Sequence, residues 1–543
     1  MKKNIYFLLV LLPVLVFSQQ EDAWVYFNDK PNAATFLNEP LTMLTQRALD
    51  RRSAQGIALS ENDVPVYQPY IEQISAASGI TVKANSKWLN CLHIRGSITD
   101  INALTSLSFV NHVTFANDAL NTSGGKISNS KSVASFNPIN KQLDVNVTFN
   151  YGNSANQIQM LNGHLLHEQN FTGAGKIIAV IDSGFINVNS TQPFERLFTN
   201  GLILGGYNYV SQSNDVYSLH NHGTLVLSCM GGFVEGQLVG TAPDAQYYLY
   251  VTEDVIDENP VEESFWVQAA EEADRVGVDV ITSSLGYFGY DNTAYSHTYS
   301  DMTGNSNFAS KGANIAFSKG MVVVASAGNA GSSSEPHVGV PAEATNVLAI
   351  GAVQSNETYA AFSSIGPSFD GRIKPDIMAQ GQAAIVANTS GATQTASGTS
   401  FSGPIMAGMI ASFWQAVPTF TNQQVVDYVK QSADMFATPN AQFGYGIPDF
   451  QLALSNALLS LEETNSSNFL VYPNPTNGNL NISIPKSLEN ANIKFYNALG
   501  QKVFQKELSQ SFSTISINDL NSGIYFYKIE YNLILKSGKI IKN

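Results

Sequence analysis

Charged residues are scarce in this sequence. Only 13% of its 543 residues are Asp, Glu, Lys or Arg, and 28 basic side chains face 43 acidic ones. No long basic run occurs, which argues against nucleic acid as a partner. The imbalance is concentrated in residues 151–460, which hold 8 basic and 26 acidic side chains. We interpret this acidic block as a separate structural unit. Wholesale disorder is excluded, because a hydrophobic content of 44% is enough to bury sizeable cores.

Cysteine and long apolar runs are lacking as well. Cys91 and Cys229 fall in segments that we assign to different domains, so no disulfide framework is predicted. Near the N-terminus, two lysines precede the largely apolar run Ile5–Phe17, which is too short to span a bilayer. This pattern predicts an export signal at residues 1–18. No later run reaches about 18 apolar residues, so no transmembrane helix is expected.

The rest of the chain divides into parts of different pattern. Residues 19–117 alternate short strands with helical segments, which predicts a small α+β domain. Residues 118–150 are rich in Asn, Ser, Gly and Lys without periodicity, which is typical of an exposed linker, and we expect a processing site there. A second, polar linker is predicted at 461–468. The strand-rich tail, 469–543, is predicted to form a small β-sandwich.

Short apolar strands alternate with helical segments throughout residues 151–460. The strands are bounded by glycine-rich turns, and the segment Phe265–Val276 has helical periodicity. Short, continuously apolar strands are typical of parallel sheets that are covered on both faces. The pattern therefore predicts an α/β domain with a parallel, doubly wound sheet. The predicted strands are Ile177–Ile181, Tyr247–Val251, Val278–Thr282, Met321–Ala325 and Val347–Ile350.

Three short motifs lie where such a sheet places its active site, at strand ends and helix starts. They are Asp182-Ser183-Gly184 after the first strand, His222-Gly223-Thr224 at the start of an apolar helix, and Gly398-Thr399-Ser400 before another helix. Taken singly, the Asp is typical of a turn and the Ser of a helix cap. Together they present Asp, His and Ser in that order. A further motif, Ala327-Gly328-Asn329, follows a fourth buried strand.

With these motifs the sequence resembles the subtilisin-like serine peptidases, the subtilase family. The segments Gly240-Thr241-Ala242-Pro243 and Gly444-Tyr445-Gly446 match too, and the resemblance covers most of residues 170–450. It implies a sheet of subtilisin type and a secreted serine endopeptidase that is made as a precursor. The position two residues after the motif serine, usually Ala in the family, is Ser402, a change that removes no reacting group.

The resemblance gives each motif residue a chemical role. Ser400 needs a base before its hydroxyl becomes a nucleophile, and His222 is the side chain that titrates nearest neutrality. Asp182 would fix the imidazole tautomer and stabilise its charged form. The Asn329 side-chain amide and the Ser400 backbone N–H would bind the oxyanion, where loss of one donor costs about 2.7 to 4 kcal/mol.

The family's pocket for the P1 side chain is also implied. With no acid at the rim residue Ala330, a P1 Lys or Arg would lack a charged partner, so we expect a preference for Phe, Leu, Tyr or Met in protein or peptide substrates. The two walls correspond to Ser284, Leu285 and Gly286 and to Ser326, Ala327 and Gly328, and the floor corresponds to Gly339.

The flanking regions resemble two known accessory domains. Residues 22–117 are similar in layout to subtilase propeptides, which implies that the chain's own propeptide is an intramolecular chaperone and inhibitor. The tail carries Tyr472-Pro473-Asn474-Pro475 and ends on Lys539-Ile540-Ile541-Lys542. In this it resembles the sorting domain of the type IX secretion machinery of Bacteroidetes, which implies a secreted or cell-surface protein. The alternative for the tail is a carbohydrate-binding or adhesive β module.

No cofactor is expected for the chemistry itself. A structural calcium ion is possible by resemblance, but no site can be assigned, because Asp301–Asn305 and the acidic run Glu253–Glu263 are equally typical of solvated loops. An α/β-hydrolase esterase would need the order Ser, acid, His and is disfavoured. The remaining alternative is a catalytically inactive exported binding or adhesion protein on the same fold.

Overall fold

The structure, a computed structural model, describes residues 20–121, 148–467, 470–483, 491–508, 512–531 and 534–543. The chain forms two compact units, Met1–Ala453 and Leu454–Asn543. Among the described residues, no helix is both long and apolar enough to cross a membrane. The predicted signal peptide at 1–18 and residues 122–147 of the predicted linker lie outside the described ranges.

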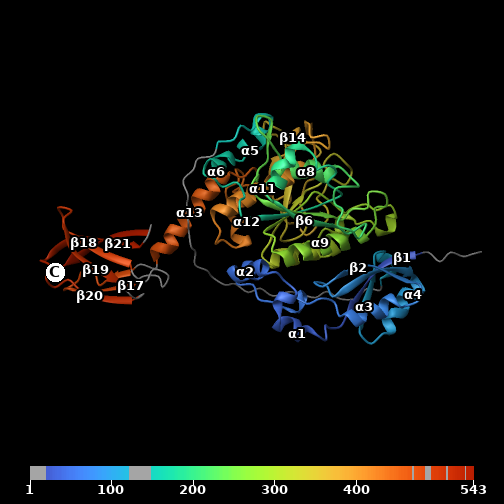
Figure 1. Cartoon of the computed structure of the whole chain (residues 1–543), viewed down its shortest axis with the longest axis horizontal. Helices are drawn as coiled ribbons and strands as arrows, with labels where there is room; N and C mark the ends of the chain where they lie inside the picture. Colours follow the sequence, from blue (N-terminus) through green and yellow to red (C-terminus); the bar gives the residue numbers. More distant parts are fainter. Residues whose placement is uncertain (1–19, 122–147, 468–469, 484–490, 509–511, 532–533) are drawn as a thin grey trace, which may run out of the picture. The chain divides into compact units, whose positions relative to one another are not determined.

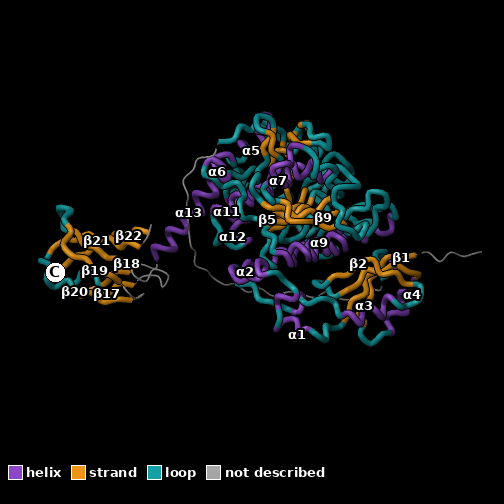
Figure 2. The backbone as a smooth tube through the Cα atoms, in the orientation of Figure 1, coloured by secondary structure: helices purple, strands orange, loops and turns teal. Residues whose placement is uncertain are grey.

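A parallel sheet of seven strands is the centre of the larger unit (Figure 2). Every strand pair in it is parallel. Four inner strands are buried along their whole length, as their continuous apolar sequences predict: Ile177–Asp182, Val280–Ser283, Val322–Ser326 and Leu348–Val353. This confirms the predicted α/β fold. In spatial order the strands are β13 (Ile377–Gln380), β12 (Leu348–Val353), β11 (Val322–Ser326), β10 (Val280–Ser283), β5 (Ile177–Asp182), β9 (Gln246–Val251) and β6 (Ile203–Asn208).

Helices cover both faces of this sheet (Figure 1). On one face, α9 (Val261–Val276) and α10 (Phe308–Ser318) share a hydrophobic core with alternate strand residues such as Ile281 and Val323. On the other face lie α8 (His222–Gly231) and α11 (Thr399–Ala416), which also pack on each other. The layers follow from the alternation of side chains along each strand.

The strand order reverses beside β5. From β5 the chain builds one side of the sheet through β6 and β9, then crosses to β10 and continues outward on the other side. In such sheets the crevice for ligands opens at the carboxyl ends of the strands next to the reversal. The carboxyl ends of β5 and β10 therefore mark where the functional site should lie.

The N-terminal domain is an antiparallel sheet with a different environment on each face. On one face Val25 and Phe27 pack against α3 (Gln68–Ser75) and α4 (Ile98–Ala103). On the other, Trp24 and Trp88 join the core formed by α9 and α10. Side-chain alternation along a strand explains both contacts. The strand order is β2 (Ile80–Ser86), β3 (Cys91–Ser97), β1 (Gln20–Phe27) and β4 (Val110–Phe115).

Between β1 and α3 the N-terminal domain carries a second, smaller core. Met43, Leu44, Ala48 and Val64 are its buried centre. Lys30 ties this part to the sheet, because its Nζ donates to the backbone carbonyls of Glu61, Val64 and Lys87. The elements are α1 (Ala33–Asn38), η1 (Pro40–Thr42), α2 (Gln46–Ala54) and η2 (Glu61–Asp63).

The smaller unit is rich in strands, as predicted for the tail. A three-stranded and a four-stranded antiparallel sheet contribute to one hydrophobic core, with Ile482 and Ile515 from the first and Phe495 and Ile529 from the second. The sheets are β16 (Leu470–Tyr472), β17 (Asn479–Ser483) and β20 (Phe512–Ser516), and β19 (Lys502–Leu508), β18 (Ala491–Tyr496), β21 (Gly523–Tyr531) and β22 (Ile534–Lys542).

The polar segment predicted as a linker at 461–468 is helical as far as Ser467, at the end of α13 (Phe450–Ser467). Glu and Ser residues there are compatible with a helix once the preceding apolar turns have nucleated it. In the N-terminal domain β2 and β3 form a hairpin, whose turn contains Asn90 with a positive φ of 51°.

Candidate active site

Asp182 is the last residue of β5 and its side chain is fully buried. Its Oδ1 accepts hydrogen bonds from the Ser183 backbone N–H and from Nδ1 of His222, both at 2.8 Å. Its Oδ2 has no hydrogen-bond partner among the described residues. Because Nδ1 of the imidazole donates to Asp182, Nε2 of the neutral ring is the free proton acceptor.

His222 is the first residue of α8, and 25% of its side chain is exposed. Its position depends on two glycines that let two backbones approach closely. A Cβ at Gly223 would lie 2.5 Å from the carbonyl oxygen of Gly184, and a Cβ at Gly184 would lie 2.5 Å from that of Ser218. Asp182-Ser183-Gly184 and His222-Gly223-Thr224 therefore form one packed junction. The negative charge of Asp182 raises the pKa of His222, which burial opposes.

Ser400 is the second residue of α11, and its carbonyl oxygen is bound in an unusual way. In a regular helix the N–H of residue 404 would bond to this oxygen, but Pro404 has no N–H. The Ser284 hydroxyl donates to it instead, at 3.0 Å. Phe401 lies beside the imidazole, with its ring centroid 6.3 Å from that of His222. The start of α11 is thus held between β10 and His222.

Asn329 is exposed, yet its amide is oriented by Thr399. Its Oδ1 accepts from the backbone N–H of Thr399 at 2.9 Å and from the Thr399 hydroxyl at 3.1 Å. The Nδ2 group is therefore turned toward Gly398. A Cβ placed on Gly398 would lie 3.6 Å from Nδ2 of Asn329 and 3.7 Å from the backbone N of Ser400. Asn329 Nδ2 and the backbone N of Ser400 thus both lie within 4 Å of one point beside Gly398.

The segments predicted as pocket walls lie at the carboxyl ends of adjacent strands. Ser284 follows β10, and the Ser326 hydroxyl, at the end of β11, donates to the Thr399 carbonyl at 2.8 Å. Tyr287 N–H bonds to the Val340 carbonyl at 2.8 Å, which brings the Ser284-Leu285-Gly286 segment close to Gly339. The side chain of Ala327 is 1% exposed, so this residue can contribute only backbone to a wall.

Sequence reasoning missed two residues near these groups. The ring of Phe288 lies 3.6 Å from where a Cβ of Gly339 would be, so it borders the predicted pocket floor. Glu253, 7% exposed, accepts from the Tyr287 hydroxyl at 2.8 Å and adds to the upward shift in the pKa of His222. Burial raises the pKa of Glu253 to about 8. Asp182 ends β5 and Glu253 comes two residues after the end of β9, and this shared position at the carboxyl end of a strand was the available signal.

The described residues contain one cluster of carboxylates that could hold a metal ion: Glu253, Glu258 and Glu262, with oxygen atoms within 4.8 Å of one another. Calcium takes six to eight oxygen ligands. Burial also raises the pKa of Glu262 to about 10, so protons compete for the same atoms. In the other segment considered, Asp301 caps the backbone at Thr298. Neither group fits a calcium ion well enough to assign a site.

The family model of the subtilases matches residues 173–446, just over half of the chain. The chain therefore belongs to the subtilase family and is a subtilisin-like serine endopeptidase. Subtilisin NAT of Bacillus subtilis subsp. natto is 32% identical over 303 residues, which cover 54% of this chain and 70% of the relative. Subtilisin of Bacillus pumilus is equally similar, 32% over 303 residues, which cover 54% of this chain and 97% of the relative.

Two further family models match the flanking domains. Residues 22–134 match the peptidase S8 propeptide domain of Bacteroidota, so the N-terminal domain is a propeptide. This match extends into the segment predicted as a linker. Residues 470–543 match the secretion system C-terminal sorting domain, which marks the protein for export to the cell surface or the medium. Both resemblances drawn from the sequence, including the type IX assignment of the tail, are confirmed.

A solved structure supports the fold over most of the chain. The epidermin leader peptide processing serine protease (EpiP) from Staphylococcus aureus aligns with a TM-score of 0.53 over 81% of this chain and 99% of that chain. The sequence identity is 16%, so this likeness concerns the fold alone.

The packed junction between the Asp182 and His222 motifs leads to a test. We expect Gly223→Ala to lower kcat/KM by about 100-fold or more, because a new Cβ would push α8 away from Gly184 and misplace His222. Gly289→Ala is the matched control, since a Cβ there meets nothing within 4 Å. Both purified variants are assayed on one peptide substrate, with circular dichroism to verify folding. Equal activity of the two folded variants would contradict the expectation.

Proposed function

We propose that Asp182, His222 and Ser400 are the catalytic triad of this endopeptidase. The observation that carries the proposal is the 2.8 Å hydrogen bond from His222 Nδ1 to the buried Asp182, beside a fixed helix start that bears Ser400. The reaction is hydrolysis of peptide bonds in protein or peptide substrates through an acyl-enzyme intermediate. The alternative, an inactive binding protein, has no observation in its favour.

In the proposed mechanism His222 moves one proton in each half of the reaction. Ser400 Oγ attacks the substrate carbonyl carbon while His222 Nε2 takes the hydroxyl proton. The imidazolium is stabilised by Asp182 and then gives that proton to the leaving amine as the peptide C–N bond breaks. A water molecule repeats the sequence on the acyl-enzyme, which releases the acid and restores Ser400.

The oxyanion of both tetrahedral intermediates is assigned to the point that Asn329 Nδ2 and Ser400 N–H face. A glycine at position 398 keeps this point free, because a side chain would occupy it. Thr399 binds the Asn329 carbonyl oxygen, so the amide is oriented before the substrate arrives. Donors fixed in advance stabilise developing charge without a reorganisation cost.

Processing of the precursor is part of the proposal. We place the cut between the propeptide and the catalytic domain in the segment 118–150, and the catalytic domain at 151–460. Until it leaves, the propeptide acts as chaperone and inhibitor of the domain that it covers. The sorting domain then engages the type IX secretion machinery.

Autoprocessing distinguishes an active enzyme from an inactive relative, because only an active enzyme can cut its own precursor. We expect Ser400→Ala protein to stay as the uncut precursor and to resist a fluorophosphonate probe, because both need the activated hydroxyl. The control is Ser402→Ala, since the buried Ser402 hydroxyl only donates to the Thr399 carbonyl. This variant should be cut and labelled like the parent. Appearance of the short form in pure Ser400→Ala protein would assign the cut to another protease.

If Asn329 binds the oxyanion, replacing it should change kcat and not KM. Asn329→Ala should lower kcat by about 100- to 1,000-fold with KM nearly unchanged, because the oxyanion exists only along the reaction path. Steady-state kinetics on a soluble peptide measures both constants. A rise in KM equal to the fall in kcat would make Asn329 a substrate-binding residue instead.

The P1 preference follows from the pocket floor. A peptide library varied at P1 should show Phe, Leu, Tyr and Met ahead of Lys and Arg, because the atoms nearest to a Cβ at Gly339 belong to Phe288 and to the backbone of Tyr287 and carry no negative charge. Gly339→Val should shift the preference to small P1 residues, since its methyl groups would fill the space toward Phe288. An optimum at Arg or Lys would show that another acid, for which Glu335 is the candidate, reaches the pocket.

A further inference from the structure

The propeptide contacts helix α9 along its whole length. Near the start of α9, the Trp24 indole N–H donates to the Ser264 hydroxyl at 2.9 Å, and the Trp24 ring stacks on Phe308. At the middle, the Glu271 carboxylate accepts from the Ser86 hydroxyl and the Trp88 backbone N–H. These two contacts come from the β-sheet of the propeptide. A third contact, at the end of α9, comes from its second core.

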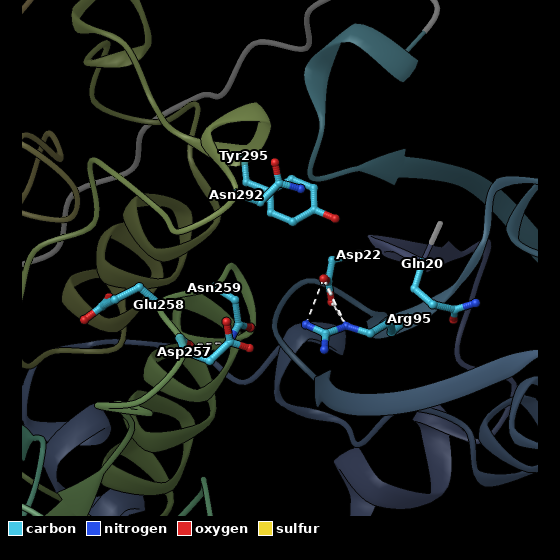
Figure 3. A pocket seen from close by; sticks show the side chains of 8 residues that line it. All are labelled: Gln20, Asp22, Arg95, Asp257, Glu258, Asn259, Asn292 and Tyr295. Carbon is cyan, nitrogen blue, oxygen red and sulfur yellow. Dashed lines mark hydrogen bonds and ion pairs between the residues drawn. The ribbon is translucent and has the colours of Figure 1, made fainter. Parts of the chain in front are cut away.

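Beside the first contact the interface is open. A cavity of about 190 Å³ separates the propeptide residues Gln20, Asp22 and Arg95 from the loop that precedes α9 (Figure 3). Arg95 pairs with Asp22 of its own domain, at 3.0 Å, and among the described residues no hydrogen bond or ion pair joins it to the exposed Asp257. The buried Glu21 does cross the interface, because its carboxylate accepts from the Tyr295 hydroxyl at 3.0 Å, but no ion pair between described residues joins the two domains at this end of α9.

The third contact is buried and consists of charges of alternating sign from both domains. We name propeptide residues 45–63, which contain α2 and η2, the clamp. Arg51 and Arg52 of the clamp both bind the carboxylate of Asp274 on α9. The side chains of Arg52 and Asp274 are 2% and 0% exposed. Pairs buried to this degree are screened little by salt.

Asp63 extends the network with a pair in which the acidic group belongs to the propeptide and the cation to the catalytic domain. Asp63 of the clamp accepts from Arg52 at 2.8 Å and pairs with Lys319 of the catalytic domain, also at 2.8 Å. The order of charges is thus Lys319, Asp63, Arg52, Asp274, and two of its three links cross the interface. Arg52 Nε and Nη1 have no partner in the described part of the chain, so the network is not fully satisfied.

Side chains of the clamp also bind backbone groups of the catalytic domain. The last turn of α9 leaves carbonyl oxygens unpaired, and a positive charge is favourable there. Arg47 Nε donates to the Gly277 carbonyl at 3.0 Å, and Arg51 donates to that of Val278. Gln55 donates to the Gly320 carbonyl at 2.8 Å and accepts from the Asn422 backbone N–H at 3.0 Å. The clamp therefore caps α9 with cationic side chains.

The clamp and the catalytic residues lie at opposite edges of the sheet. Val278 and Asp279 precede β10, and Gly320 precedes β11, so the clamp binds the amino ends of these strands. Ser284 and Ser326 lie at their carboxyl ends. Ser284 comes five residues after Asp279 along the strand, a span of about 17 Å at about 3.3 Å per residue. The clamp therefore lies outside the proposed active site.

We propose that the clamp is a second binding site for the cut propeptide, at the amino edge of the sheet, and that its buried charges set how slowly the cut propeptide dissociates. The proposal rests on the proposed function in one respect, that the propeptide is cut from the catalytic domain. Cutting in the segment 118–150 leaves every contact of the clamp intact. The partly unsatisfied Arg52 keeps the clamp reversible, because buried ion pairs regain little of their desolvation cost unless all their polar atoms are bound.

The test uses a full chain that cannot cut itself, so it does not depend on the proposed catalysis. A recognition sequence for a site-specific protease is inserted within residues 122–147 of the Ser400→Ala chain, which is then cut in vitro. The dissociation rate of the propeptide is measured on protein immobilised through its C-terminus. Arg52→Gln is compared with Asp50→Asn, a charge-to-amide change on the same helix, where Asp50 is exposed and bonds only to Gln46.

We expect Arg52→Gln to release the cut propeptide about 100-fold faster than the parent, because one change breaks two buried links. Asp50→Asn should stay within about twofold, as is usual for exposed positions. A rate for Arg52→Gln within threefold of the parent would overturn the proposal. If Arg52→Gln does not fold, Gln55→Ala removes two interdomain hydrogen bonds without leaving a buried charge. We expect about tenfold faster release from Gln55→Ala, and an unchanged rate would also overturn the proposal.

Discussion

The hydrogen bond from the Ser284 hydroxyl to the Ser400 carbonyl links the main parts of the active site. It exists because Pro404 removes the helical donor that this oxygen would otherwise have. A buried carbonyl without a donor would be costly, so a proline in the second turn of α11 requires a partner from outside the helix. Ser284 begins a wall of the proposed pocket. The proline thereby couples the position of Ser400, the proposed nucleophile, to the position of that wall.

Thr399 has the same role on the other side of Ser400. Its hydroxyl, N–H and carbonyl bind Gly328, Asn329 and Ser326, which lie at the end of β11 or directly after it. The ends of β10 and β11 and the start of α11 are thus one hydrogen-bonded body. Rigid elements hold reacting groups more accurately than loops do. This arrangement explains why the proposed oxyanion donors, Asn329 Nδ2 and the Ser400 N–H, are oriented in the absence of substrate.

Local patterns were sufficient to predict the sheet and the motif residues, because strands covered on both faces have continuous apolar sequences and their ends are marked by glycine. The same reasoning failed where the outcome depends on distant residues. Nothing near Arg52 in sequence indicates Asp274, which is 222 residues away. The sequence does not place Phe288 at the pocket, because its position depends on the hydrogen bond from the Tyr287 N–H to the Val340 carbonyl. The helical continuation of α13 to Ser467 was missed because polar composition alone does not end a helix.

The acidic excess of the central block also has a partial explanation in the fold. Asp274 has its cationic partners Arg51 and Arg52 in the propeptide, and Asp279 pairs both with Arg47 of the propeptide and with Lys176 of its own domain. A carboxylate buried without a partner is strongly unfavourable. When the propeptide leaves, Asp274 must therefore gain water. Part of the acidic excess of the catalytic domain is thus one side of a charge pairing that the propeptide completes.

The two edges of the sheet face different physical demands. The carboxyl edge must admit substrate chains, so any inhibitor bound there competes with every peptide that the enzyme meets. Substrate does not bind at the amino edge, so a partner can be held there by apolar packing and buried charge without blocking the reaction. A propeptide that stays bound during export is held better at the amino edge, because substrate does not compete with it there. Placing Arg51, Arg52 and Asp63 at the amino edge meets that demand, because each extra contact there lengthens the bound state without altering the active site.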